Sequence, residues 1–318
     1  MIIIRTPLRL SIAGGGTDLP KFYRKYNSNF ISTTIDRYIY INLSKSFYEK
    51  FILRYSKYES VRNIYSIKHR IIREVLNRYH DINDYLEIVS IADVPSGTGL
   101  GSSGSFTVGL INALNFYNNK YMSPIDLAYN AFKIESKYLK LSCGLQDQLI
   151  ASCGGIRSFK IDTKENISIE DLKISGEFID NLNHNFLLFR IGDSRDSEKI
   201  LKKQNTSKKD VNQNLLKTQE LVKYFKKAIL NNDMKLFSEL LNEHWRIKSN
   251  RINGIVKTKH QEIYEYALNN GATGGKLVGA GADGCMLFLC DNPNLLRKKL
   301  AKFKEIKFNY TAQGSTLI

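Results

Sequence analysis

A glycine-rich segment, Gly97-Thr-Gly-Leu-Gly-Ser-Ser-Gly104, constrains the fold of this chain more than any other feature. It follows an apolar, strand-like run at Tyr85–Ala92 and precedes a helix-like run at Phe106–Leu114. Glycines let a backbone approach a ligand closely, and the free amides at a helix N-terminus attract anions. The segment therefore predicts a strand, a phosphate-binding loop and a helix, in that order.

Two widespread nucleotide motifs fit this segment poorly. Gly99, Gly101 and Gly104 satisfy G-x-G-x-x-G, but a dinucleotide site also needs a second strand that ends in an acid about 20 residues on. Here the polar residues 115–122 lead into another helix-like segment. The Walker A pattern fails because no Gly-Lys-Ser/Thr follows. A Rossmann-type site and a glycine turn that only serves packing stay open as less favoured alternatives.

A second segment places a carboxylate on an apolar helix face. Ser123-Pro-Ile-Asp126 has the capping hydroxyl and the early proline of a helix start. On that helix Glu135 shares a face with Ala128 and Ala131, and Gly144-Leu-Gln-Asp-Gln148 follows. A carboxylate on an apolar stripe is costly unless a cation or a donor meets it. A salt bridge and a Mg²⁺ ligand both satisfy this requirement.

A third glycine-rich segment, Gly274–Gly284, precedes a strand-like run at Cys285–Cys290, so a turn accounts for it by itself. Three such segments in one chain of enzyme size nevertheless indicate a shared ligand that carries phosphates.

Strands and helices alternate without a regular βαβ rhythm, which predicts an α+β fold. The length of 318 residues suits two domains, and the polar stretch 162–183 is the expected junction, which divides the chain into residues 1–170 and 171–318. Asp36-Arg37 is expected to form a hairpin turn. The other expected strands are Ile2–Arg9, Phe30–Ile35, Tyr38–Leu43, Phe186–Ile191 and Ile306–Tyr310, and the expected helices are Ser66–Tyr79, Ser123–Lys140, Val211–Leu230, Met234–Lys248, Gln261–Leu268 and Pro293–Phe303.

The charge is strongly basic, with 47 Lys and Arg against 31 Asp and Glu, a net charge of +16. Nucleic acid, an anionic small substrate and a plain compositional bias each fit such a balance. The lysines between positions 202 and 227 spread over expected helices without interleaved aromatic side chains. This pattern disfavours nucleic acid and leaves the other two interpretations open.

Several remaining classes of protein are disfavoured by simpler features. No run of about 18 apolar residues predicts a membrane span, and the N-terminus does not resemble a signal peptide. Four cysteines in a chain of this length do not indicate a disulfide framework, and the five histidines show no zinc spacing. We therefore expect a cytoplasmic protein without a membrane partner, whose oligomeric state the sequence leaves open.

The three segments together resemble the GHMP kinases, named for galactokinase, homoserine kinase, mevalonate kinase and phosphomevalonate kinase. Pro95 followed by Gly99-Leu-Gly-Ser-Ser103 looks like the phosphate loop of that family, and Glu135 with Gly144–Gln148 looks like its metal-ligand and catalytic-base stretch. Gly274–Gly284 resembles its C-terminal glycine motif, except that Ala282-Asp283 replaces glycines. The fold implied is two α+β domains, the second ferredoxin-like, with the active site in the cleft between them.

The N-terminal segment narrows the resemblance. Arg5-Thr-Pro-Leu-Arg9 and the following Gly14-Gly-Gly-Thr-Asp18 resemble the opening of the heptose 7-phosphate kinases, and bacterial fucokinase-like members begin similarly. The stretch 240–248 also resembles the heptose kinases. Galactokinases carry a Glu-His pair where this chain has Gly15-Gly16, which disfavours galactose.

The resemblance implies an ATP-dependent sugar kinase that uses Mg²⁺ and phosphorylates the 1-hydroxyl of D-glycero-D-manno-heptose 7-phosphate. Asp147 would act as the base with Arg9 beside it, and Ser103 and Glu135 would hold the metal. ATP and the sugar phosphate are then the expected partners. The implied nucleotide-binding residues are Pro95, Gly97, Gly99, Leu100, Gly101, Ser102, Ser103 and Gly104, and the implied sugar-binding residues are Gly16, Thr17, Asp18 and Arg195, with Lys21 and Arg24 as further candidates for the 7-phosphate.

Two alternatives stay open beside this interpretation. The chain could be another sugar-1-kinase, such as a fucokinase. It could also be a non-catalytic, ligand-binding relative, although Ser103, Glu135 and Asp147 together argue for catalysis.

Overall fold

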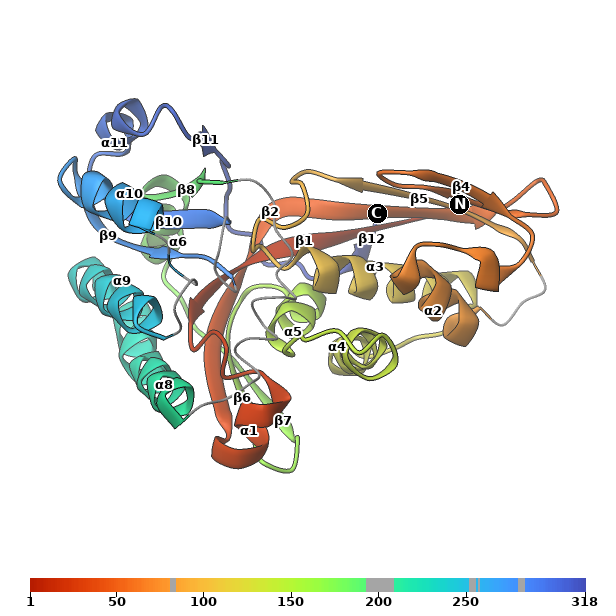
Figure 1. Ribbon diagram of the computed structural model, residues 1–318, viewed down its shortest axis with the longest axis horizontal. Helices are drawn as coiled ribbons and strands as arrows, with labels where there is room; N and C mark the ends of the chain where they lie inside the picture. Colours follow the sequence, from red (N-terminus) through yellow and green to blue (C-terminus); the bar gives the residue numbers. More distant parts are fainter. Residues whose placement is uncertain (81–83, 193–208, 252–255, 257, 280–283) are drawn as a thin grey trace.

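Two sheets of different size organise the chain in the computed structural model, which describes residues 1–80, 84–192, 209–251, 256, 258–279 and 284–318 (Figure 1). The larger sheet holds eight strands and the smaller sheet four in the described part of the chain. Helices α2 to α5 cover one face of the larger sheet (Figure 1). This is the α+β architecture in two parts that the sequence predicted.

The long strand β2 (Ser28–Lys45) forms the centre of the larger sheet. Strand β1 (Ile2–Ala13) pairs with it along almost its whole length, in antiparallel sense. On its other edge, the first half of β2 pairs with β6 (Ile156–Ile161) and the second half with β5 (Leu86–Ala92). The remaining strands of this sheet are β3 (Phe51–Arg54), β4 (Tyr58–Val61), β7 (Ile167–Asp171) and β12 (Thr316–Leu317).

The predicted hairpin at Asp36 and Arg37 is wrong, because β2 continues through both residues. The register of β1 against β2 shifts between Pro7 and Leu8, so this polar pair forms a bulge instead of a turn. Asp36 also accepts a hydrogen bond from the Asn309 amide at 2.7 Å. A distant segment therefore satisfies the polar group that looked like a turn signal.

Helix α3 (Ser102–Tyr117) begins at the predicted phosphate loop and lies on β1 and β2, buried along most of its length. Helix α4 (Pro124–Lys133) starts as predicted but ends early, and the chain continues as one π-helical turn at Ile134–Tyr138. Glu135 lies in that turn, a type of irregularity that is frequent at functional sites. The other elements of this part are α1 (Pro20–Tyr26), a 3₁₀ turn (Ile64–Ser66), α2 (Arg70–Tyr79) and α5 (Gln146–Cys153).

The smaller sheet has the order β11-β8-β10-β9, with every neighbouring pair antiparallel. Gly274 and Gly275, where a turn was considered, lie within strand β9, and a Cβ on Gly274 would come within 2.6 Å of the Ser238 carbonyl oxygen. The glycine thus lets α9 pack directly on the strand. The elements are α6 (Gly176–His184), β8 (Phe186–Arg190), α8 (Lys209–Leu230), α9 (Met234–Ser249), α10 (Thr258–Leu268), β9 (Ala272–Leu277), β10 (Cys285–Cys290), α11 (Pro293–Lys299) and β11 (Lys304–Glu305).

The C-terminal segment returns to the larger sheet. The predicted strand at Ile306–Tyr310 is wrong, since these residues form only one bridge, between Tyr310 and Ile35, before the chain continues to β12. The position of the domain division at 170/171 stays a prediction. In the part of the chain that the structure describes, no helix is long and apolar enough to cross a membrane.

The contact between α3 and β1 predicts a position-specific cost of adding one methyl group. A Cβ on Gly109 would lie 2.7 Å from the buried Thr6 hydroxyl, whereas a Cβ on Gly176, the first residue of α6, would meet nothing within 4 Å. We expect Gly109→Ala to lower the free energy of unfolding by about 1–3 kcal/mol. Gly176→Ala should leave it unchanged or slightly higher. Urea titrations of both variants test this, and equal stabilities would contradict the contact.

Candidate active site

A cavity lies where the end of β1, the loop before α3 and the start of α5 meet the C-terminal part of the chain. Residues of the Gly14–Asp18 loop and of the phosphate loop line it, together with Arg251 and Gly279 from the second part. The three segments singled out in the sequence therefore converge on one space, between the two parts of the molecule.

The loop before α3 has the conformation that a phosphate cradle needs. Gly97, Gly99 and Gly101 have φ of 81°, 80° and 78°, values that favour glycine. Ser102 and Ser103 line the cavity, and no side chain caps this helix N-terminus. The amides of the first turn are thus available to an anion. Pro95, Leu100 and Gly104 shape the loop but do not line the cavity.

The third glycine segment lies directly against this loop. A Cβ on Gly279 would come within 2.6 Å of the Gly99 Cα, and a Cβ on Gly99 within 2.8 Å of the Val278 carbonyl oxygen. Neither position tolerates a side chain, so glycines allow the two backbones to touch. Ala282-Asp283, the departure from the family motif, lies outside the described residues.

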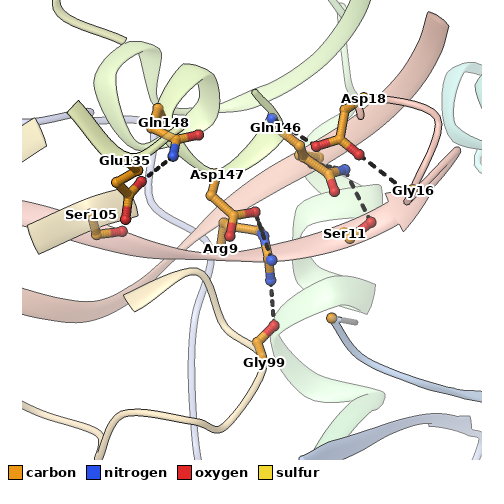
Figure 2. Close-up of polar contacts among 12 residues, drawn as sticks. Arg9, Ser11, Gly16, Asp18, Gly99, Ser105, Glu135, Gln146, Asp147 and Gln148 are labelled. Carbon is orange, nitrogen blue, oxygen red and sulfur yellow. Dashed lines mark hydrogen bonds and ion pairs between the residues drawn. The ribbon is translucent and has the colours of Figure 1, made fainter. Parts of the chain in front are cut away.

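Arg9 and Asp147 form the central ion pair of the cavity (Figure 2). The Arg9 Nε donates to Asp147 Oδ1 at 2.7 Å, and its Nη1 donates to the Gly99 carbonyl oxygen. Both residues line the cavity, but the Arg9 side chain is only 6% exposed and that of Asp147 33%, so the carboxylate is the more accessible of the two. This arrangement links β1, α5 and the phosphate loop, and orients an accessible carboxylate.

Asp18 lies on the other side of the cavity and is almost completely buried. The amides of Gly16 and Gln146 each donate to its carboxylate at 3.1 Å. Burial, and then the nearby charge of Asp147, raises the pKa of Asp18, while these two amides lower it. A Cβ on Gly144 would lie 1.8 Å from Asp18 Oδ2, so the glycine before α5 is required for this packing.

The other residues expected to bind sugar are placed differently. Thr17 is buried behind the loop, and its hydroxyl donates to the Gly14 carbonyl oxygen at 2.8 Å. Lys21 and Arg24 do not line the cavity, and Arg24 pairs with Glu165 at 2.6 Å on the surface. Arg195 lies outside the described residues. Gly16 does line the cavity, as expected.

Glu135 is 2% exposed and accepts hydrogen bonds from the Ser103 hydroxyl and the Gln148 amide. Burial raises its pKa to about 7, and these two hydrogen bonds partly oppose the rise. No described cation pairs with Glu135, so the interpretation as a salt bridge, which the sequence left open, does not hold for the described part of the chain. Hard oxygen donors beside a helix N-terminus fit a Mg²⁺ ion that shares its shell with phosphates. Among the described residues, no three His, Cys, Asp or Glu side chains cluster as a metal site.

Buried cations from the C-terminal part lie at or near the cavity: Arg251 lines it, and Lys248 and Lys276 lie close to Arg251. The sequence gave no signal for their role. Lys276 donates to the carbonyl oxygens of Ser11 and Ile12 at 2.9 and 2.8 Å, and Lys248 donates to those of Leu277 and Gly279. Burial, followed by the charges of Arg251 and Arg9, lowers the pKa of Lys276 to about 7. These lysines bind the end of β1 and the third glycine segment into one unit.

Family models match both parts of the chain. The model for the N-terminal domain of GHMP kinases matches residues 66–155, and the model for their C-terminal domain matches residues 225–306. Together they span more than half of the chain. The chain belongs to the GHMP kinase family.

Individual relatives of this GHMP kinase are similar over nearly its whole length. It is 29% identical to a D-glycero-alpha-D-manno-heptose 7-phosphate kinase from Campylobacter jejuni, over 98% of this chain and 96% of the relative. A crystal structure of a D-glycero-D-manno-heptose 1-phosphate kinase from Bacteroides thetaiotaomicron superimposes with a TM-score of 0.81 at 21% identity, over 100% and 99% of the two chains. A putative sugar kinase from Campylobacter jejuni gives 0.77 at 25% identity, over 100% and 98%.

The buried carboxylate of this GHMP kinase predicts a pH-dependent stability without metal. The pKa of Glu135 rises from 4.5 to about 7 on folding, so its contribution is fully present below about pH 4.5 and is lost as the pH rises to about 7. Glu135→Gln removes the titratable carboxylate, so the variant does not lose this stability as the pH rises. Over that window, the free energy of unfolding of the variant should gain up to roughly 3 kcal/mol relative to wild type. Urea titrations in EDTA between pH 4.5 and 7.5 measure the difference, and parallel curves would contradict it.

Proposed function

We propose that this protein is an ATP-dependent sugar kinase that phosphorylates the anomeric 1-hydroxyl of D-glycero-D-manno-heptose 7-phosphate to give the 1,7-bisphosphate. The observation that carries the proposal is the Arg9–Asp147 pair, an accessible carboxylate beside a phosphate-binding helix N-terminus. The similarity to a heptose 7-phosphate kinase over 98% of the chain supports the substrate class.

The nucleotide side of the proposal uses backbone groups. The three left-handed glycines at 97, 99 and 101 keep side chains away from the loop, and the first-turn amides of α3 can donate to phosphate oxygens. The helix dipole favours negative charge at the same position. When bound, Mg²⁺-ATP supplies the transferred phosphoryl group and the divalent charge that phosphoryl transfer requires.

Ser103 and Glu135 are the residues that would hold the metal. They are hydrogen-bonded to each other, and Gln148 donates to the second carboxylate oxygen, so the pair is oriented before a ligand arrives. Burial raises the pKa of Glu135, whereas a divalent cation bound to its carboxylate would keep the carboxylate ionised. Binding of the metal is therefore expected to release a proton below about pH 7.

Asp147 is the proposed general base. Its open carboxylate faces the cavity and can accept the proton of the attacking sugar hydroxyl, while Arg9 restricts its orientation. Arg9 also bonds to the phosphate loop at Gly99, so the same side chain sets the base relative to the nucleotide. Proximity of this kind is worth several kcal/mol of the reaction barrier.

Asp18 is the proposed acceptor for sugar hydroxyls, with Gly16 beside it. Its carboxylate is held by two backbone amides, so its position does not depend on the ligand. A buried, preoriented carboxylate rejects ligands that cannot donate to it, because the unpaired charge then stays desolvated.

One prediction of the proposed function concerns the base. Asp147→Asn should reduce the rate of phosphoryl transfer by roughly 10²–10⁴-fold, because the amide still accepts a hydrogen bond from Arg9 but cannot take a proton. ATP binding should stay near normal. Asp171→Asn is the matched control, since Asp171 pairs with Arg157 at the surface and its side chain is 71% exposed. Single-turnover kinetics decide this, and near wild-type turnover of Asp147→Asn would refute the assignment.

Another prediction of the proposed function concerns the sugar. In one buffer, kcat/KM should be far higher for D-glycero-D-manno-heptose 7-phosphate than for the unphosphorylated heptose, L-fucose or D-galactose, because charge-assisted contacts to a phosphate are stronger than neutral ones. Added salt should raise KM for the phosphorylated sugar by screening. Phosphorus NMR of the product identifies the oxygen that is phosphorylated. A preference for fucose would replace this proposal by a fucokinase, and no turnover of any sugar would favour a ligand-binding relative.

A further inference from the structure

Arg251 is a buried arginine at the edge of the cavity, directly after α9. It is 5% exposed and lines the same cavity as Asp18 and Gly15. Its Nε donates to Asn214 Oδ1 at 2.9 Å, its Nη2 to the Thr218 hydroxyl at 2.7 Å and its Nη1 to the Gly15 carbonyl oxygen at 3.3 Å. These acceptors orient the guanidinium, but none of them carries a charge.

No carboxylate within the described ranges compensates the charge of Arg251. Burial lowers its pKa to about 10, and two further cations, Lys248 and Lys276, lie close enough for Arg251 to lower their pKa values. An uncompensated buried cation is costly, and the neighbouring cations add to that cost. An anionic group in the adjoining cavity would offset the cost.

Gly15 and Gly16 separate Arg251 from Asp18. The Gly15 carbonyl oxygen accepts from Arg251, while the next amide, that of Gly16, donates to Asp18 at 3.1 Å. A Cβ on Gly15 would lie 2.9 Å from the Ser11 hydroxyl, so the absence of a side chain lets this residue lie close to β1. The Arg251 cation and the Asp18 carboxylate, which can accept hydrogen bonds from hydroxyl groups, thus lie on either side of one short backbone segment. Both residues line the same cavity.

Resting on the proposed function, we propose that Arg251 binds the phosphate group that the sugar already carries and so determines the preference for a phosphorylated sugar. A guanidinium pairs with two phosphate oxygens at once, in a fixed plane that a lysine cannot reproduce. Asp18 would then contact the hydroxyls of the same molecule. The surface candidates Lys21 and Arg24 lie away from the cavity.

The test compares two substrates in each variant. We expect Arg251→Gln to lower kcat/KM for heptose 7-phosphate by about 10²-fold, the scale for loss of a charged hydrogen-bonding partner, and to change it less than tenfold for the unphosphorylated heptose. For Arg251→Lys, kcat/KM for heptose 7-phosphate should lie between the values of wild type and Arg251→Gln, because this variant keeps the charge but loses the paired donors. Arg246→Gln is the matched control, since Arg246 lies on α9, is 70% exposed and pairs only with Glu243 among the described residues.

A second measurement is independent of the sugar. Inorganic phosphate should raise the Tm of wild type and of Arg246→Gln, with the phosphate loop filled by a non-hydrolysable ATP analogue, and should have little effect on Arg251→Gln. If wild type does not turn over heptose 7-phosphate but phosphate stabilises it through Arg251, the proposed function fails and the phosphate site stands. Equal losses for both sugars in Arg251→Gln, or a raised KM for ATP alone, would overturn the role of Arg251 and leave the kinase assignment intact.

Discussion

The ion pair between Arg9 and Asp147 is the contact on which the cavity depends. Arg9 comes from β1, Asp147 from the first turn of α5, and the same guanidinium reaches the phosphate loop at Gly99. Because Arg9 is buried, loss of the Asp147 carboxylate would leave a buried cation without its charged partner, which is unfavourable. The pair therefore joins three elements and keeps the Asp147 carboxylate at the surface of the cavity.

The charges around this pair come from different parts of the chain. The carboxylates Asp18, Glu135 and Asp147 belong to the N-terminal part, and the buried cations Lys248, Arg251 and Lys276 belong to the C-terminal part. Lys276 crosses between the parts, since its ammonium is held by carbonyl oxygens of β1. The two parts consequently share one electrostatic environment, which combines carboxylates of the N-terminal part with buried cations of the C-terminal part.

Local signals predicted the elements that carry the site. Glycines before a helix-like run located α3 and the glycine-rich loop before it, and an acid on an apolar stripe singled out Glu135. Two of the errors share one physical cause, contact with a distant segment. The sequence Asp36-Arg37 is typical of a turn, but contacts with Asn309 and β1 hold the pair as a bulge. The sequence Gly274-Gly275 is also typical of a turn, but contacts with β10 and α9 hold it as a strand. The π-helical turn at Glu135 had no local signal, because the preceding helix could have continued unbroken.

The sequence by itself determined the features that depend on particular residue types. These features are the glycine-rich loops, the helix starts and the carboxylates of the family motifs. These depend on steric freedom and side-chain chemistry within a few residues, which a linear pattern records. Tertiary structure alone decided which charges meet. Arg251 and Lys276 look like ordinary members of a basic chain, and their burial follows only from the tertiary contacts that bring Arg251 to Gly15 and Lys276 to Ser11. Burial changes the free energy of a charge far more than its position in the sequence does, so the electrostatics of this cavity had to be read from the fold.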